Sequence, residues 1–298
     1  MGRQDFKFIL YFLFTHFSSH LFAQICEKDI PKIYVSDKAR AIYESKLTEA
    51  KVNFQNNPSA DNLIWLGRRE AYLGNYETAI DLYTKGIDEY PKDARFYRHR
   101  GHRYISSRCF DLAIKDFKKA VGLTRYEDNE MEPDGLPNAL GIPTSTLQGN
   151  IYYHLGLTYY IQKKYHKARY AYEKCLKLAE NNDSYVAAAN WLYVIYRHLG
   201  QDRRAAKLLN TIEDDMDLIE NHSYQTILQL YQNKIDPLDL EKEIMDGQSL
   251  ANTTLAFGLG NYYSINGDED KAQYLFSMVT RGNQWSAFGY ITSESRLK

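Results

Sequence analysis

The feature of this sequence that most constrains its fold is an internal repeat. The stretch that begins at Trp65 is followed, 34 residues later, by a second stretch with the same order of small and aromatic residues. The matching pairs are Gly67 with Gly101, Tyr76 with Phe110, Ala79 with Ala113, Tyr83 with Phe117, and Gly86 with Ala120. Small residues at this spacing let two helices touch, and the aromatic residues fill the space between them. Each unit is therefore expected to be a helix–turn–helix that buries its apolar face only by stacking on neighbours.

The pattern resembles the tetratricopeptide repeat, and three further stretches match it at least in part. Their matching residues are Leu155, Gly156, Tyr159, Tyr165, Ala168 and Tyr172 in the third repeat, Leu192, Tyr196, Gly200 and Ala205 in the fourth, and Leu259, Gly260, Tyr263, Gly267, Ala272 and Phe276 in the last. The resemblance implies an all-α fold, a right-handed superhelical solenoid of helix–turn–helix repeats with a long acidic insertion.

Residues 24–298 are expected to form a single tetratricopeptide-repeat domain. Because nearly two periods separate Ala205 from Ala272, a degenerate hairpin must lie between the fourth repeat and the last. The expected parts are a capping helix at 36–57, repeats one and two at 60–124, the insertion at 125–149, repeats three and four at 150–212, the degenerate hairpin at 220–248, the last repeat at 252–282, and a closing helix at 284–294.

Several blocks also resemble one uncharacterised bacterial family of tetratricopeptide-repeat proteins. They are IWLGRREAYLGNYETAI, YRHRGHRYISSRCFDLAI, EPDGLPNALGIPTSTLQGNIYYHLGLTYY and QWSAFGYI. The resemblance covers nearly all of residues 24–298 and includes the insertion. It is weakest in the fourth repeat and in the hairpin after it, and it implies no activity.

The first 23 residues have the layout of a secretory signal peptide. Arg3 and Lys7 precede the apolar run 8–14, and the small residue Ala23 precedes Gln24. The run is far shorter than the roughly 20 residues that a membrane-spanning helix needs. We therefore expect export to the periplasm or the medium, with cleavage near Gln24 and no stable membrane insertion; a buried or anchoring first helix is the alternative.

Charge and cysteine content exclude some classes of function. The formal net charge is −1, so no overall field points to nucleic acid or to an anionic membrane. The three cysteines, Cys26, Cys109 and Cys175, show no pairing pattern, so we expect no disulfide framework. Ile25 stands where a lipidated cysteine would need a small residue, which argues against lipid attachment at Cys26.

The sequence contains none of the compact catalytic or nucleotide-binding motifs, such as a phosphate-binding glycine loop, a nucleophile elbow or a zinc-protease helix. His99 and His102 could share a metal ion, but the neighbouring arginines would repel a cation. The acidic residues before Gly135 lack the spacing of a calcium loop. We expect no enzyme activity, no metal and no cofactor.

The resemblance to tetratricopeptide repeats implies which side chains line the concave face. They are Arg68, Tyr72, Arg95, Arg98, His102, Asn150, Tyr153, Tyr160, Asn190, Arg197, His198 and Asn261. Four of them are arginines, while the one acid at these positions is Asp61, at the rim of the array. Since arginine presents a planar fork of donors that suits carboxylates, this surface favours an acidic ligand. A solvated basic face without a ligand is the alternative.

The insertion carries three prolines and five acidic residues, and after Arg125 it has no lysine or arginine. A loop this long in a compact array is usually functional or disordered. Its apolar residues favour packing, and it leaves the array beside Arg95 and Arg98. We therefore expect it to fold against the concave face with at least one carboxylate near the arginines, as a wall of the groove or as a plug. A mobile loop on the convex side is the alternative.

Glu70 and Arg100 are charged residues at sites where the repeat usually has Tyr and Leu. Because both sites face the interface between successive first helices, two departures of opposite charge predict a buried ion pair between them.

Together these patterns predict a non-enzymatic protein-interaction module. It would bind an acidic peptide or protein segment in a basic, tyrosine-lined concave groove. The rival hypothesis is an assembly scaffold that contacts partners through its edges while its own insertion fills the groove. The sequence names neither the partner nor the oligomeric state.

Overall fold

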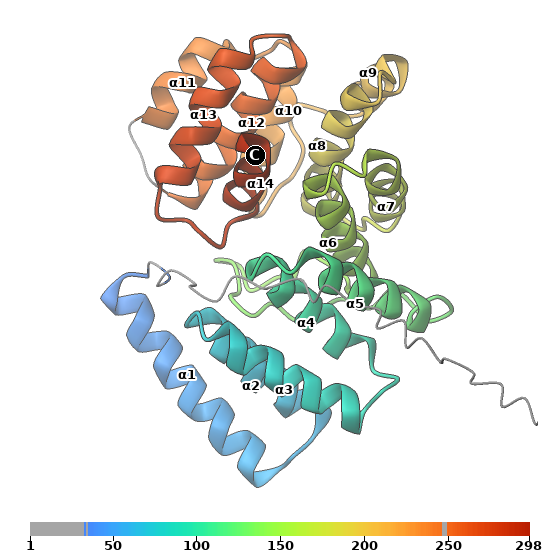
Figure 1. Cartoon of the computed structure of the whole chain (residues 1–298), viewed down its shortest axis with the longest axis vertical. Coiled ribbons are helices and arrows are strands. Elements are labelled where there is room, and N and C mark those ends of the chain that lie inside the picture. The colour runs from blue at the N-terminus through green and yellow to red at the C-terminus, as the bar shows by residue number, and fades with distance from the viewer. Residues whose placement is uncertain (1–32, 34, 246–248) are drawn as a thin grey trace, which may run out of the picture.

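The described part of the chain is all-α, as expected from the repeat. A computed structural model describes residues 33, 35–245 and 249–298, and these contain fourteen helices and no strand (Figure 1). One isolated antiparallel bridge, between Met131 and Thr146, closes the base of the insertion. The expected signal peptide at 1–23 lies outside the described residues, as do Cys26 and residues 246–248 of the expected degenerate hairpin.

The helices follow one another mostly as hairpins. They are α1 (Asp37–Asn56), α2 (Ala60–Tyr72), α3 (Tyr76–Glu89), α4 (Ala94–Ser106), α5 (Phe110–Leu123), α6 (Leu147–Ile161), α7 (Tyr165–Lys177), α8 (Asn182–His198), α9 (Asp202–Leu209), α10 (His222–Tyr231), α11 (Pro237–Met245), α12 (Leu250–Ile265), α13 (Glu269–Arg281) and α14 (Phe288–Leu297). The helix α1 lies within the range expected for the capping helix, and α10 and α11 lie within the range of the degenerate hairpin.

The repeat glycines sit where the two helices of a hairpin touch. A Cβ atom added at Gly67 would lie 2.5 Å from the ring of Tyr83, and one added at Gly101 would lie 2.9 Å from the ring of Phe117. Both aromatic rings are buried, at 1% and 0% exposure. The spacing seen in the sequence is thus the spacing of close interhelical contacts.

The C-terminal elements fold back toward the first repeats. Figure 1 shows α14 between the α12–α13 pair and the central helices, on the side that faces α4 and α6. Trp285, in the turn before α14, is buried in the apolar cluster that α2 and α3 form, and its ring stacks on Tyr76 at a centroid distance of 6.5 Å. The solenoid is therefore closed across its concave side rather than open.

The closing helix begins later than expected. Residues 282–287 form a turn, and α14 starts at Phe288 instead of near Gln284. The turn is held by Arg108, whose Nε lies 2.9 Å from Glu294 Oε2 and whose Nη2 donates to the Trp285 carbonyl at 3.0 Å. Arg108 adopts a left-handed backbone conformation (φ 58°) that is uncommon for a residue other than glycine. Long-range contacts of this kind carry no local sequence signal.

The expected ion pair between Glu70 and Arg100 is wrong. Arg100 binds Asp116 in a bidentate manner, with Nε–Oδ2 at 2.7 Å and Nη2–Oδ1 at 2.9 Å. Glu70 instead lies 3.3 Å from Lys51 Nζ and accepts from Asn75 Nδ2 at 2.7 Å. The partners of Glu70 lie on α1 and in the turn after α2, and the partner of Arg100 lies on α5. The two departures from the consensus are therefore independent.

Two of the cysteines lie in the described part of the chain. Cys175 is a buried free thiol, and burial raises its pKa to about 12. Cys109, in the turn before α5, is disulfide-bonded. The sequence offered no pairing pattern, so this bond was missed.

Candidate functional site

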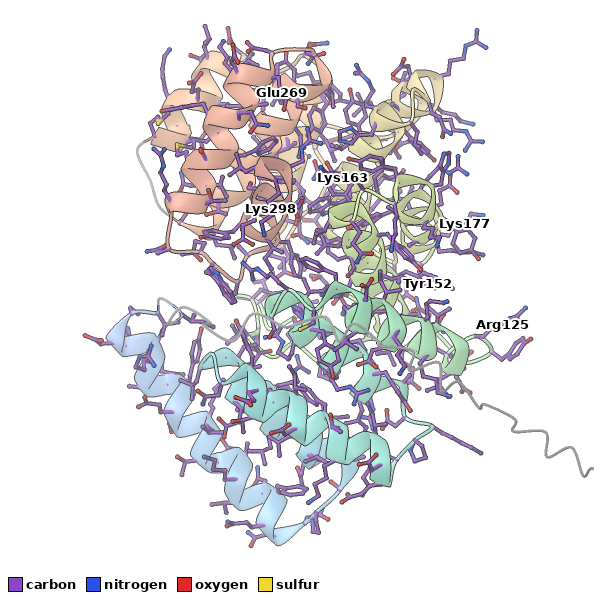
Figure 2. All side chains as sticks on the ribbon, viewed as in Figure 1. Arg125, Tyr152, Lys163, Lys177, Glu269 and Lys298 are labelled. Carbon is purple, nitrogen blue, oxygen red and sulfur yellow. The ribbon has the colours of Figure 1, made fainter. Side chains whose placement is uncertain are left out.

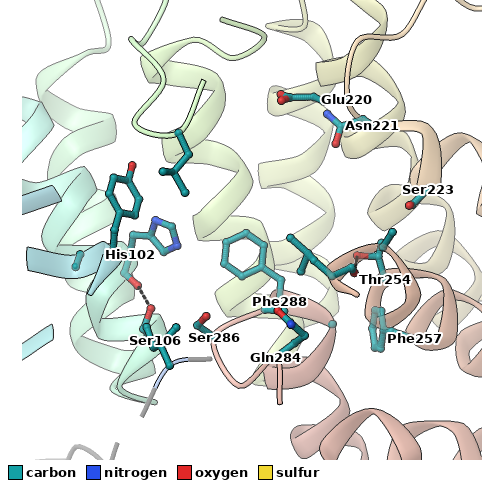
Figure 3. A pocket seen from close by; sticks show the side chains of 18 of the residues that line it. His102, Ser106, Glu220, Asn221, Ser223, Thr254, Phe257, Gln284, Ser286 and Phe288 are labelled. Carbon is teal, nitrogen blue, oxygen red and sulfur yellow. Dashed lines mark hydrogen bonds between the residues drawn. The ribbon is translucent and has the colours of Figure 1, made fainter. Parts of the chain in front are cut away.

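A central cavity lies between the first repeats, the insertion and the C-terminal helices. Its volume is about 640 Å³, and its walls come from α1 to α4, α8, α10, α12, α14, the insertion and the segments that precede α10 and α14 (Figure 3). Most of the lining is apolar and aromatic, including Tyr72, Trp191, Phe257 and Phe288. Concave sites of about 300–1,000 Å³ with apolar walls and a few polar groups are typical of ligand pockets.

Arg103 is the cation in the wall of this cavity. It projects from α4, and its guanidinium lies over the Tyr76 ring at 5.0 Å from the ring centroid. Among the described residues it has no carboxylate within ion-pair distance and no side-chain hydrogen bond. A half-buried guanidinium without an anionic partner is a ready binding group for a carboxylate.

Asn190 is a second group in the wall that lacks a partner. Its side chain is 3% exposed, and no described donor reaches its Oδ1. Buried amide oxygens are nearly always hydrogen-bonded, so one that faces a cavity indicates a ligand or a water molecule there.

The insertion places a carboxylate in the groove, as expected. Glu132 is 7% exposed; its Oε2 lies 3.0 Å from Arg98 Nε and accepts from Asn150 Nδ2 at 2.9 Å, while its Oε1 lies 3.3 Å from His99 Nε2. The prediction that an acid of the insertion lies near the arginines is confirmed. The charge of Arg98 is therefore neutralised within the chain.

Several contacts hold the insertion in place on both of its sides. Arg69 Nη1 donates to the Gly135 carbonyl at 2.7 Å, Asn181 Nδ2 donates to the Thr144 carbonyl at 3.0 Å, and Thr144 donates its hydroxyl proton to Glu220. A Cβ added at Gly135 would lie 1.5 Å from the Tyr72 hydroxyl oxygen, so only glycine permits this approach. Such contacts are those of a fixed wall.

Beside the insertion lies a smaller cavity of about 330 Å³, which shares His102, Glu220, Asn221, Tyr224 and Phe288 with the central one. Trp191 Nε1 donates to the Tyr153 hydroxyl at 2.7 Å, and the Tyr153 and Tyr224 hydroxyls are 2.9 Å apart. Burial raises the pKa of Tyr153 well above its usual value, so both phenols are neutral at physiological pH.

The histidines next to these cavities are neutral. Burial, and then the charge of Arg98, lowers the pKa of His154 to about 3. Burial and nearby arginines likewise place the pKa of His99 and of His102 well below the usual value. His154 contacts His102 at a ring distance of 4.4 Å and Phe288 at 5.3 Å, so these rings act as packing surfaces.

Six of the twelve expected site residues line the two cavities. They are Tyr72, Arg98, His102, Asn150, Tyr153 and Asn190. Arg68 is buried nearby and lies over the Trp65 ring at 4.5 Å.

The other five expected residues serve packing or internal ion pairs. Arg95 pairs with Asp61 and Asp93, and Arg197 lies 3.0 Å from Asp202. Tyr160, His198 and Asn261 form one buried contact, with the Tyr160 hydroxyl 3.1 Å from His198 Nε2 and 3.4 Å from Asn261 Oδ1. The C-terminal helices cover this part of the concave face, which an open solenoid would have left exposed.

Sequence reasoning missed Arg103 and Glu220. Arg103 stands two residues after Gly101, outside the positions taken from the repeat family, and Glu220 lies in a loop between α9 and α10. Figure 2 shows exposed cations such as Arg125 and Lys177 on the outer side of the array, so a cation alone is no signal of the site. Only the fold distinguishes Arg103 from them.

Neither a metal site nor a membrane-spanning element is visible in the described ranges. Within residues 33, 35–245 and 249–298, no three His, Cys, Asp or Glu side chains are placed to hold a metal ion. Over the same residues, no helix combines the length and the hydropathy needed to cross a bilayer.

Comparison with known proteins identifies the repeat. The family model described as tetratricopeptide repeat matches residues 149–182. The small glutamine-rich tetratricopeptide repeat-containing protein 2 of Saccharomyces cerevisiae is 27% identical over 128 residues, which are 43% of this chain and 31% of the yeast protein. The match thus spans less than a third of that relative.

Two solved structures are also similar to parts of the chain. A tetratricopeptide repeat protein from Parabacteroides merdae has a TM-score of 0.49 at 14% identity, covering 86% of this chain and 94% of that one. The first repeat domain of Spaghetti, bound to an HSP90 peptide, has a TM-score of 0.38 at 27% identity, covering 47% of this chain and 93% of that one. Residues 149–182, which include α6 and α7, therefore match a tetratricopeptide repeat, and the hairpins on their N-terminal side show the same contact between a glycine and an aromatic ring.

Proposed function

We propose that this protein is a non-enzymatic interaction module that binds an acidic segment of a partner protein in the central cavity. Tetratricopeptide-repeat proteins are in general protein-interaction modules, and their stacked hairpins form concave binding surfaces. The partner's carboxylate would bind Arg103.

The observation that carries this proposal is the unpaired state of Arg103 in a cavity of suitable size. The expected groove arginines Arg95, Arg98 and Arg197 already have carboxylate partners within the chain. Arg103 has none among the described residues and faces the cavity. An incoming carboxylate would therefore gain charge-assisted hydrogen bonds there without displacing an internal acid.

The test is binding of the full chain to an array of peptides that differ in their number of Asp and Glu residues. We expect acidic peptides to bind, Arg103→Gln to weaken their binding at least tenfold, and Arg203→Gln to have no effect. Arg203 is the matched control because it is exposed on α9, away from the cavity. Equal binding by wild type and Arg103→Gln would refute the proposal.

A second candidate is the assembly scaffold, which one observation favours. The tip of the insertion exposes apolar side chains, with Leu136 at 48%, Leu140 at 66% and Ile142 at 50% exposure. Exposed apolar groups that lie together often mark interaction surfaces. If capture of partners from extract depended on Leu140→Ser and not on Arg103→Gln, the scaffold would be the better account.

We also propose export of the chain, on the layout of residues 1–24 alone. The mature protein would begin at or near Gln24. N-terminal sequencing of the native protein tests this, and recovery of Met1 in the cytosol would contradict it.

A further inference from the structure

The central cavity has an acidic group, Glu220, at the end opposite to α4. Glu220 lies in its wall and is exposed, and the only described partner of its carboxylate is the Thr144 hydroxyl. Asp134 of the insertion is not part of the wall but lies near Glu220: burial raises its pKa, the charge of Glu220 raises it further, and the charge of Arg68 lowers it. Asp134 Oδ2 is buried without a hydrogen-bond donor, and neither acid has a cation within ion-pair distance in the described part of the chain.

The opposite end is positive. In Figure 3, Ser106 of α4 and Ser286 lie at one end of the cavity, and Glu220 and Asn221 lie at the other. Arg103 belongs to the α4 end, three residues before Ser106 on the same helix. With His102 neutral, Arg103 supplies the positive charge of that wall. The cavity is thus polarised along its length.

Between the charged ends, the wall offers an acceptor and apolar rings. Asn190 Oδ1 is buried without a partner among the described residues and faces the cavity, so it can accept a hydrogen bond from a ligand N–H. Trp191, Phe257 and Phe288 surround it with apolar surface. A donor on the ligand would satisfy this oxygen, which is costly to leave unbonded when buried.

We infer that the cavity recognises a peptide segment carrying a carboxylate and an ammonium group at opposite ends. The carboxylate binds Arg103, a backbone N–H binds Asn190, and the ammonium lies at Glu220, near the charge of Asp134. The inference rests on the proposed function and adds the requirement that the ligand also carry a positive charge. Two sources supply this chemistry: a short peptide with both termini free, or a longer segment with a lysine and an acid at similar spacing.

Calorimetric titration of the full chain with four defined peptides tests the inference. The first three are a tetrapeptide of leucine and alanine with free termini, its N-acetylated form and its C-amidated form. The fourth is capped at both ends and carries lysine near its start and glutamate near its end. We expect binding of the free tetrapeptide, of the capped Lys–Glu peptide, or of both.

Blocking one charge of a peptide that binds should weaken its binding about fivefold, as loss of an exposed ion pair at the upper end of the usual range does. For the free tetrapeptide, Glu220→Gln should weaken binding by the same factor as N-acetylation. The two changes together should weaken binding no more than either change alone. Glu213→Gln is the control, because Glu213 is an exposed acid outside the cavity. Asp134→Asn provides a second variant in case Glu220→Gln disturbs the contact with Thr144.

The outcomes separate the sources and the two proposals. Binding of the free tetrapeptide alone indicates a peptide with free termini, and binding of the capped Lys–Glu peptide alone indicates side-chain charges. The inference is overturned if neither peptide binds, or if N-acetylation, Glu220→Gln and Asp134→Asn leave binding unchanged. If the acidic peptides of the array still require Arg103 in that case, the proposed function stands without the second charge.

Discussion

The two halves of the concave face are filled in different ways. Over α2 and α4 the filling element is the insertion, which brings Glu132 to Arg98 and its Gly135 carbonyl to Arg69. Over α6 and α8 it is α12 and α14, which bring Phe257 to Trp191 at a ring distance of 5.4 Å. The first half is closed mainly by charge and hydrogen bonds, and the second mainly by aromatic packing.

The closure of the first half has a signal in the sequence, and the closure of the second half has none. An acidic loop beside basic helices can be recognised in a sequence, because the acids of the insertion and the arginines of the helices are each unusual at their positions. Trp191 and Phe257 look like ordinary core residues of their own hairpins, so nothing marks them as partners across the groove.

The largest effect is expected from the residue that joins the two halves. Trp285 is 7% exposed, stacks on Tyr76, and lies under the Arg108 guanidinium at 3.7 Å. Trp285→Ala should lower the free energy of unfolding by about 3–5 kcal/mol, as for other buried aromatic residues. Urea denaturation followed by circular dichroism measures this. The exposed Tyr274→Ala is the control, and equal losses for both would mean that the closure contributes little.

The charge-closed half should respond to loss of one carboxylate. Glu132→Gln keeps the shape of the side chain but leaves Arg98, whose side chain is 10% exposed, without its counter-charge. We expect a loss of about 3 kcal/mol, the lower range for breaking a buried pair, and faster proteolysis of the insertion. Glu130, two residues away, is exposed, so Glu130→Gln should lower the free energy of unfolding by under about 0.5 kcal/mol. Similar stability of the two variants would refute the role of Glu132.

Acid should destabilise both halves through their neutral histidines. The pKa of His154, beside the insertion, is lowered to about 3, and that of His198, which contacts Arg296 of α14, is lowered to about 4, by burial first and nearby arginine second. The unfolded chain therefore binds more protons below pH 6.5, and stability falls as the pH falls toward these values. Each histidine should lower the free energy of unfolding by about 2 kcal/mol between pH 7 and pH 5.

The measurement is the free energy of unfolding at pH 7, 6 and 5 for wild type, His154→Asn and His198→Asn. Each variant should show a shallower decline than wild type, by up to about 1.4 kcal/mol per pH unit. A decline that neither substitution changes would show that other groups govern the acid response.

The smallest expected effect is the coupling energy between Glu70 and Arg100, which should be near zero. Because Glu70 and Arg100 have separate partners, a double-mutant cycle between them should give a coupling energy under about 0.5 kcal/mol. The cycle between Arg100 and Asp116 should give a clearly larger value, since these two groups share two hydrogen bonds. A large Glu70–Arg100 coupling would restore the pairing that the sequence suggested.

The fold could be predicted largely from local pattern, and the site only in part. Gly67 and Tyr83, or Gly101 and Phe117, lie within one hairpin, so their contact depends on residues about 16 positions apart and recurs with the period. The expected groove positions assumed an open solenoid. They therefore included Tyr160 and Asn261, which the C-terminal helices bury, and omitted Arg103, which the closure leaves facing a cavity.

By itself, the sequence determined the helical hairpins, their stacking and the acidic character of the insertion, because small residues, aromatic residues and charges act there at short and regular spacing. Only the tertiary structure decided which charges neutralise one another and which remain free. That outcome depends on contacts such as Arg108 with Glu294, 186 positions apart, which no local pattern encodes. The closure of the array, and the polarised cavity that it leaves, arise from the burial of Trp285 and Phe288 against repeats far away in the chain.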